Sequence, residues 1–218
     1  NDRLFVGTPS DRRRFIHQLI ELSHTEFGTL YSQYTHYIQE RSQILRMPHS
    51  DATWLDRLEA NIADLAAQIY TARTDFVATL NTWIKQLSHF SYHRFEMQDE
   101  LFEDLAAELK LNRSADQIRG GCKVGPHKSD LVGYRYDMPL HLCSNGQQCI
   151  GLFSILLGLV KQHSQTQPVL FLIDEVFSHL DKTHQDLLLQ ELKAMPSVQT
   201  FITLPHVAHF PEAQIIQL

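Results

Sequence analysis

The sequence feature that most constrains the fold is an apolar run at residues 168–173 (PVLFLI), followed directly by Asp174 and Glu175. The run is apolar throughout and does not alternate with polar residues, which is typical of a strand buried on both faces of a parallel sheet. A helix is expected over 187–195, ended by Pro196, and a second buried strand over 199–204. Strand, helix and strand in this order predict a βαβ unit, and hence an α/β fold for this part of the chain.

The earlier part of the chain has a different pattern. Between residues 15 and 111 apolar residues recur at helical spacing, and Gly28 is the only glycine. Pro48 should break this region, because proline cannot continue the helix before it. Trp54 and Trp83 follow the same spacing, so we expect both to pack in a core. The pattern predicts a bundle of three or four helices. Its three expected apolar faces contain Leu55, Leu58, Ile62, Leu65 and Ile69; Phe76, Val77, Leu80, Ile84 and Leu87; and Leu101, Phe102, Leu105 and Leu109.

Composition excludes several classes of protein. The formal net charge of the 218 residues is −6, so bulk positive charge cannot attract nucleic acid and any contact must use a local basic patch. There is no apolar run of about eighteen residues, which excludes a membrane-spanning helix. The three cysteines form no CxxC pair, which favours a reducing cytoplasm over a disulfide scaffold. The thirteen histidines lack zinc-ligand spacing, so no histidine metal site is expected.

The acids after the apolar run suit nucleotide chemistry. At the carboxyl edge of a parallel sheet, where α/β proteins bind ligands, Asp174 can hold Mg²⁺ directly or through water. Glu175 can accept a proton from an attacking water. The alternative is a strand that ends in a solvated acidic turn, and this motif by itself does not decide between the two.

A second candidate site opens an apolar helix expected over residues 147–162. Ser144 is a natural N-cap, and Gly146 allows the backbone to approach a ligand closely. The free amides and the helix dipole at such an end can bind an anion such as a phosphate. By itself the pattern is equally that of an ordinary capped helix. Its position before the strand that ends in Asp174 is the order found in ABC-type ATPases.

Four motifs together resemble a known family. They are Gly7–Phe15 (GTPSDRRRF), Gly125–Leu131 (GPHKSDL), Ser144–Gln148 (SNGQQ) and Val169–Asp181 (VLFLIDEVFSHLD). In order and interval they are similar to the motifs of the RecF family of bacterial recombination and gap-repair proteins, over nearly the whole chain. The combination is specific, although each motif by itself is short.

The resemblance implies an α/β ATPase lobe of the ABC and SMC-head type, with an inserted all-α helical lobe. Residues 1–14 would end the N-terminal part of the ATPase lobe and residues 15–115 would form the helical lobe. Residues 116–218 would be the C-terminal part of the ATPase lobe, with its signature, Walker B and D-loop segments. It also implies ATP and Mg²⁺ as cofactors and weak ATPase activity in the full-length family.

The resemblance further implies a role in DNA replication, repair and the SOS response to DNA damage. The protein would form an ATP-dependent homodimer in the cytoplasm, away from membranes. It would bind double-stranded DNA at gaps or junctions and help RecR and RecO to load RecA.

The roles of single residues follow from the same resemblance. Asp174 would be the acid linked to Mg²⁺ and Glu175 the catalytic base. Asp181 would lie in the loop that crosses the dimer interface. The signature that meets the γ-phosphate of ATP held by the partner subunit would contain Ser144, Gly146 and Gln147.

The basic residues of these motifs allow two interpretations. Arg12, Arg13 and Arg14 form the only dense basic cluster and are candidates to contact DNA phosphates, as is Lys128. Pairing of the arginines with acids inside the protein is an equally good interpretation. The turn that contains His127 and Lys128 also has conformational reasons to exist.

The chain departs from the family in ways that leave the function open. The phosphate loop G-x-x-x-x-G-K-[ST] is absent, because residues 120–128 (GGCKVGPHK) lack its lysine and hydroxyl residue after the second glycine. We therefore expect a RecF chain without its N-terminal part, which should not hydrolyse ATP alone and should leave apolar sheet faces exposed. Leu204 stands at the expected end of the last strand, where RecF proteins have a threonine. The alternatives are a non-catalytic DNA-binding or scaffolding module and a shortened SMC relative.

Overall fold

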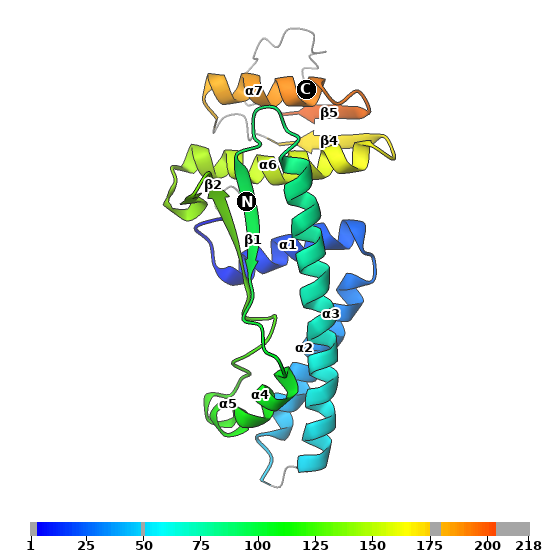
Figure 1. Ribbon diagram of the computed structural model, residues 1–218, viewed down its shortest axis with the longest axis vertical. Helices are drawn as coiled ribbons and strands as arrows, with labels where there is room; N and C mark the ends of the chain where they lie inside the picture. The colour runs from blue at the N-terminus through cyan, green and yellow to red at the C-terminus, as the bar shows by residue number, and fades with distance from the viewer. Residues whose placement is uncertain (1–3, 49–50, 175–179, 204–218) are drawn as a thin grey trace.

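The computed structural model describes residues 4–48, 51–174 and 180–203. A helical arm occupies one end of an elongated molecule and a small α/β layer the other, with a short antiparallel sheet between them (Figure 1). From α1 near the middle, the chain runs down and back along the arm, goes down again to α4 and α5, returns through β2, and then builds the upper layer. The predicted fold class, an α/β part of ABC and SMC-head type joined to a helical part, is confirmed.

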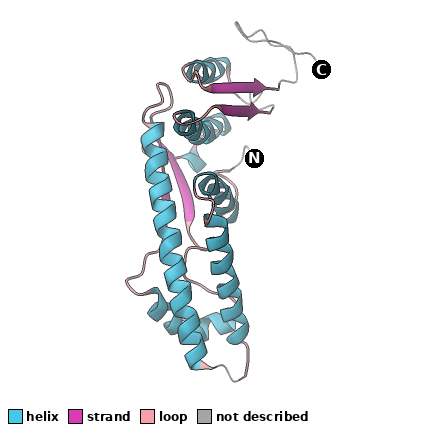
Figure 2. Ribbon diagram, turned by 90° about the vertical axis from the view of Figure 1, so that its right-hand side faces the viewer, coloured by secondary structure: helices cyan, strands magenta, loops and turns pink. Residues whose placement is uncertain are grey.

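The arm consists mainly of two long helices. After α1 (Pro9–Ser23), α2 (Phe27–Ile44) and α3 (Ala52–Ile84) run side by side (Figure 2). The break expected at Pro48 is confirmed, and the Asp51 carboxylate begins α3 by accepting a hydrogen bond of 2.8 Å from the Thr53 amide. Two of the apolar faces expected from the sequence belong to this one helix of 33 residues.

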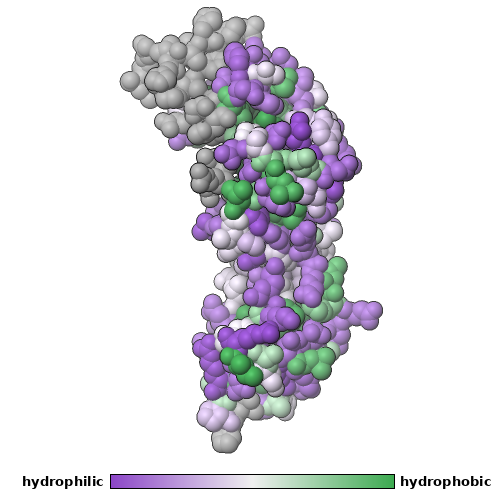
Figure 3. All heavy atoms as spheres, turned by 90° about the vertical axis from the view of Figure 1, so that its left-hand side faces the viewer, coloured by the Kyte–Doolittle hydropathy of each residue, from purple (hydrophilic) through white to green (hydrophobic). Residues whose placement is uncertain are grey.

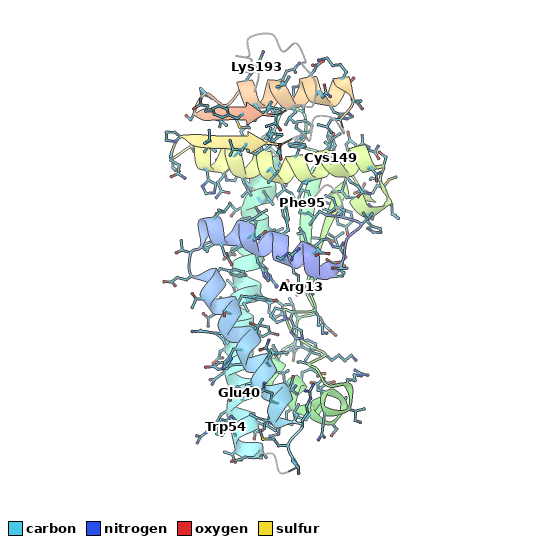
Figure 4. The ribbon with its side chains drawn as sticks, turned by 180° about the vertical axis from the view of Figure 1, so that it is seen from behind. Arg13, Glu40, Trp54, Phe95, Cys149 and Lys193 are labelled. Atoms are coloured by element: carbon cyan, nitrogen blue, oxygen red, sulfur yellow. The ribbon has the colours of Figure 1, made fainter. Side chains whose placement is uncertain are left out.

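The far end of the arm is closed by two short helices, α4 (Leu105–Leu111) and α5 (Arg113–Arg119). Apolar side chains are exposed on the face where these helices lie (Figure 3), among them Leu101 and Ile118. The prediction that Trp54 packs in a core is wrong, because it is 56% exposed. It lies in the first turn of α3, before the helix reaches its main packing partners (Figure 4).

A strand that sequence reasoning missed joins the arm to the rest of the molecule. β1 (His93–Gln98) lies within the stretch expected to be helical, and it pairs antiparallel with β2 (Asp130–Arg135) over six residues. β3 (Met138–Pro139) extends the sheet by one short ladder. The strand alternates, with His93 and Phe95 buried, but six residues carry little signal without the partner that follows 30 residues later.

The upper layer contains the predicted βαβ unit. The short 3-10 helix η1 (Leu140–Leu142) leads into α6 (Asn145–Ser164), which is followed by β4 (Val169–Ile173), α7 (Lys182–Lys193) and β5 (Val198–Ile202). β4 and β5 are parallel, in the register Ile173↔Ile202. The prediction of a strand–helix–strand unit is confirmed. Helix α7 begins five residues before the expected start, because Asp181 provides its N-cap.

The expectation that β4 is buried on both faces is wrong for the chain as it stands. Val169, Phe171 and Ile173 pack towards the core, whereas Leu170 and Leu172 are 60% and 67% exposed. On β5, Phe201 is also exposed. One face of the two-stranded sheet is therefore uncovered, which agrees with the expectation of exposed apolar sheet faces.

Candidate functional site

The ends of two strands and the starts of two helices lie on one side of the upper layer. The carboxyl ends of β4 and β5 point the same way because the strands are parallel, and α6 and α7 both begin at that end (Figure 1). The α6 helix turns back through residues 165–168 into β4, so its amino end lies towards the finish of that strand. Asp174 and Thr203, which follow β4 and β5, form what is called the strand-end site, and the N-caps Ser144 and Asp181 begin the two helices on the same side of the layer.

Asp174 follows β4 and is tied to the neighbouring strand. The Thr203 hydroxyl donates a hydrogen bond of 2.5 Å to Asp174 Oδ1, and the Thr203 amide donates to the Ile173 carbonyl at 2.9 Å. Sequence reasoning missed Thr203 because it placed the end of the strand at Leu204, whereas β5 ends at Ile202. Glu175 and Leu204 lie outside the residues that the structure describes.

Ser144 begins α6 as predicted. Its hydroxyl accepts a hydrogen bond of 3.4 Å from the Gln147 amide, and Gln147 Oε1 accepts one of 3.1 Å from the Ser144 amide. This reciprocal capping box leaves the amides between them free to face a ligand. A Cβ at Gly146 would meet no atom of the chain within 4 Å, so the space in front of this turn is open.

Gln148 and Cys149 face inwards from the same turn. The Gln148 amide nitrogen donates to the Cys143 carbonyl at 2.9 Å, and Cys149 is buried. Of the paired glutamines, Gln147 lies on the open side, where its carbonyl oxygen is occupied by the capping box.

Asp181 is the N-cap of α7. It accepts hydrogen bonds from the His184 amide at 2.9 Å and from His184 Nδ1 at 2.8 Å. Both bonds lower the pKa of Asp181 from its usual value, and the bond from the backbone amide has the larger effect. The carboxylate is exposed to solvent, so it holds its negative charge on the same side of the layer as the strand-end site.

The strand-end site suits a magnesium–nucleotide complex better than a metal ion bound by protein alone. Among residues 4–48, 51–174 and 180–203 no group of three histidine, cysteine, aspartate or glutamate side chains could hold a metal. Mg²⁺ is commonly bound by one or two carboxylates together with phosphate oxygens and water. A single carboxylate beside a hydroxyl at the end of a parallel strand fits that chemistry.

The three arginines of the basic run have three different environments. Arg12 is engaged inside the protein, with Nε and Nη2 each 2.7 Å from the Asp130 carboxylate and Nη1 2.6 Å from the Gly7 carbonyl. Arg13 donates one hydrogen bond, to the Ser129 carbonyl at 2.6 Å. Arg14 has an exposed ion pair of 3.3 Å with Asp11. Internal pairing, one of the two interpretations of the run, holds for Arg12.

Arg13 and Arg14 border an open hollow of about 380 Å³ on the side of α1 (Figure 4). Its lining also includes Ser10, His17, Gln18, Glu21, Tyr31 and His127. Burial is the main cause that lowers the pKa of His17 to about 3, and the positive charges of Arg73 and Arg13 lower it further. Burial also lowers the pKa of His127, helped by the charges of Lys128 and Arg13, although the hydrogen bond to the Cys122 carbonyl acts to raise it. Both imidazoles are therefore neutral near pH 7, and the positive charge at the hollow comes from the arginines and the exposed Lys128.

The turn that precedes Lys128 has a structural role. His127 Nδ1 and the Tyr34 hydroxyl are 2.6 Å apart, and His127 Nε2 lies 3.0 Å from the Cys122 carbonyl. Gly125 has φ +120°, and a Cβ there would collide with the Tyr34 hydroxyl. The motif residues 125–131 thus lock the start of β2 against α2.

Together, the parallel βαβ layer, the adjoining antiparallel sheet and the long helical arm give the chain a fold of the ABC and SMC-head type. Two solved structures of the recombination mediator protein RecF in the RecFOR pathway have this fold. The match to the RecF–ATP structure covers 98% of this chain and 61% of the RecF chain, with a TM-score of 0.77. The match to the RecF–ATPrS structure covers 95% of this chain and 60% of the RecF chain, with a TM-score of 0.75. In both matches 20% of the aligned residues are identical.

Curated proteins give the same family. The DNA replication and repair protein RecF of Streptococcus equi subsp. zooepidemicus is 31% identical over 96% of this chain and 62% of its own length. That of Rickettsia akari is 28% identical over 99% of this chain and 65% of its own. No family model matches the sequence. The chain is thus a RecF homologue along nearly its whole length, consistent with a C-terminal portion, and it spans less than two thirds of these relatives.

Proposed function

We propose that the chain is part of an ATP-switched DNA replication and repair protein of the RecF type. The observation that carries the proposal is the strand-end site, where a carboxylate that accepts a hydrogen bond from a hydroxyl lies at the end of a parallel strand, on the side of the layer where the capped helix α6 begins. The relatives that match nearly the whole chain bear the RecF name, and one solved relative is described with ATP. A protein with three buried cysteines and no disulfide among them suits the cytoplasm, where we place it.

In this proposal the site is completed by a second copy of the chain. Mg-ATP, when bound, supplies the phosphoryl group whose hydrolysis resets the switch. Asp174 holds the Mg²⁺, and Glu175 accepts the proton of the attacking water. Ser144, Gly146 and Gln147 present the amino end of α6 to the γ-phosphate bound by the partner, and Asp181 lies beside the interface. The same patch is used on both subunits, so the dimer is closed.

The chain as given carries no phosphate-loop lysine, and we expect no ATP hydrolysis from it alone. Binding of the β- and γ-phosphates is assigned to the part of the protein that corresponds to the rest of the RecF relatives. Experiments on the nucleotide therefore use the natural protein as its cell makes it.

DNA contacts are assigned to Arg13, Arg14 and Lys128. Arg12 is removed from the candidates because its guanidinium is already held by Asp130 and by backbone carbonyls. Arg13 and Arg14 line an open hollow of about 380 Å³, where their guanidinium groups could contact a backbone phosphate. Double-stranded DNA at gaps or junctions, and cooperation with RecR and RecO in loading RecA, complete the proposed role.

The measurement that tests this function is the Mg-ATP dependence of DNA binding by the natural protein. We expect binding to gapped duplex DNA to tighten at least about tenfold with Mg-ATP, a coupling of the size common for two-site proteins. A non-catalytic scaffold would bind DNA equally well with and without nucleotide. Equal affinities, together with no detectable ATP binding, would replace the ATP switch with that alternative.

A further inference from the structure

Thr203 stands in the strand-end site without any role assigned by the motifs. It is the first residue after β5, and the parallel ladder continues through it, because its amide donates to the Ile173 carbonyl at 2.9 Å. The register that pairs Ile173 with Ile202 brings Thr203 next to Asp174. The two residues thus stand where the two strands finish.

The side chains of this pair are joined as well as their backbones. The Thr203 hydroxyl donates a hydrogen bond of 2.5 Å to Asp174 Oδ1. Only one oxygen of the carboxylate accepts this bond. Asp174 Oδ2 is left to bind a cation or a water that a cation holds.

We propose that Thr203 is a positioning residue for Asp174, which fixes the carboxylate so that its second oxygen faces the Mg²⁺ of bound Mg-ATP. This inference rests on the proposed ATP-binding function. Hydrogen bonds to a metal ligand from a second residue orient the ligand, and their loss typically weakens metal binding about 10- to 100-fold. The bond also links the metal ligand to the end of β5, so that the two strand ends move together when Mg²⁺ binds.

The proposal separates Mg²⁺ binding from nucleotide binding. Threonine and valine have nearly the same shape, so Thr203→Val removes the hydroxyl donor with little change in packing. Thr203→Ser keeps the donor and removes a methyl group. Thr200 lies on the same strand and is half-buried, so Thr200→Val is a matched control.

The experiment is a Mg²⁺ titration of the binding of a fluorescent ATP analogue to the natural protein and to the three variants. We expect Thr203→Val to raise the Mg²⁺ concentration needed for half-maximal tightening about tenfold. Because the packing is kept, its affinity for the analogue without Mg²⁺ should stay within about twofold of that of the parent protein. Its melting temperature should stay within about 2 °C of the parent value. Thr203→Ser and Thr200→Val should behave like the parent.

Each other outcome contradicts a defined part of the account. A Thr203→Val protein with parental Mg²⁺ dependence would overturn the positioning role while leaving the ATP site intact. Equal losses with and without Mg²⁺, or no rescue by serine, would mean that Thr203 acts only on packing. Failure of the parent protein itself to bind the analogue would instead refute the proposed function.

Discussion

The arm and the upper layer use charged side chains in opposite ways. In the arm, Arg41 is fully buried between the carboxylates of Glu59 and Asp116, at 2.8 and 2.7 Å, and it also donates to the Leu109 carbonyl. On the side of the upper layer where α7 begins, Asp181 is exposed, and its carboxylate accepts hydrogen bonds from His184 of the same helix. Charge that is buried and paired holds helices together, whereas exposed charge with local partners remains available to a ligand.

A second buried arginine joins the arm to the first helix and to the antiparallel sheet in the middle of the molecule. Arg73 of α3 donates to the Pro126 carbonyl at 2.9 Å and to the Ser129 hydroxyl at 3.0 Å, and its Nη2 lies 2.7 Å from His17 Nε2. Arm, first helix and the 125–131 motif therefore meet at one cation. The motifs typical of the RecF family therefore serve two purposes. The 125–131 motif takes part in the contacts around Arg73, whereas the motif at 169–181 contributes Asp174 to the strand-end site.

The largest effect is expected from breaking the buried network of the arm. Arg41→Ala would leave Glu59 and Asp116 with fewer partners in a buried site, and removal of one partner from such a network costs about 3–5 kcal/mol. Arg57→Ala, on an exposed turn of α3, should change stability by less than about 0.5 kcal/mol. Urea denaturation followed by circular dichroism measures both. Equal, small effects would show that the network does not hold the arm.

A smaller effect is expected at the hollow beside α1. The double variant Arg13→Gln/Arg14→Gln should weaken DNA binding and reduce the slope of log affinity against log salt by about 2, since each phosphate contact contributes about 0.9. Arg57→Gln/Arg119→Gln removes the same charge from exposed positions on the arm and serves as the control. Fluorescence anisotropy at several salt concentrations gives the slopes. A control that loses as much as the test variant would assign DNA binding to overall charge.

The smallest effect concerns the joint that Arg73 forms between the arm and the first helix. Burial, Arg73 and Arg13 lower the pKa of His17 to about 3, so the unfolded chain takes up a proton below pH 6.5 while the folded protein does not. Stability from this group is complete above pH 6.5 and falls as the pH drops, by at most about 1.4 kcal/mol per pH unit. His93, with a pKa of about 4, adds a similar dependence.

His17→Gln should therefore flatten the loss of stability between pH 6.5 and pH 5 by the equivalent of up to one proton. The glutamine can still accept a hydrogen bond from Arg73, so the joint keeps its geometry. The measurement is the unfolding free energy at several pH values for both proteins. Identical slopes would show that His17 is protonated in the folded joint.

Much of the upper layer could be predicted because its signals are local. The run 169–173 and the N-cap Ser144 depend on neighbouring residues, and both lie where the sequence placed them. The strand β1 and the pairing of Arg12 with Asp130 depend on contacts with residues 30 or more positions away. No local pattern indicates such distant contacts. The sequence therefore did not decide whether Arg12, Arg13 and Arg14 pair inside the protein, and it did not predict β1. Thr203 was missed because the end of β5 is set by its pairing with β4.

The central claim is that the amino end of α6 contacts the nucleotide of a partner subunit, and self-association of the natural protein tests it most directly. Sedimentation velocity with and without Mg-ATP would compare the parent protein with Ser144→Thr, which keeps a capping hydroxyl, and Ser144→Arg, which places a bulky cation at the helix start. We predict that the parent and Ser144→Thr dimerise with Mg-ATP. Ser144→Arg should bind ATP with parental affinity and remain monomeric. Normal ATP-dependent dimers of Ser144→Arg would contradict the claim.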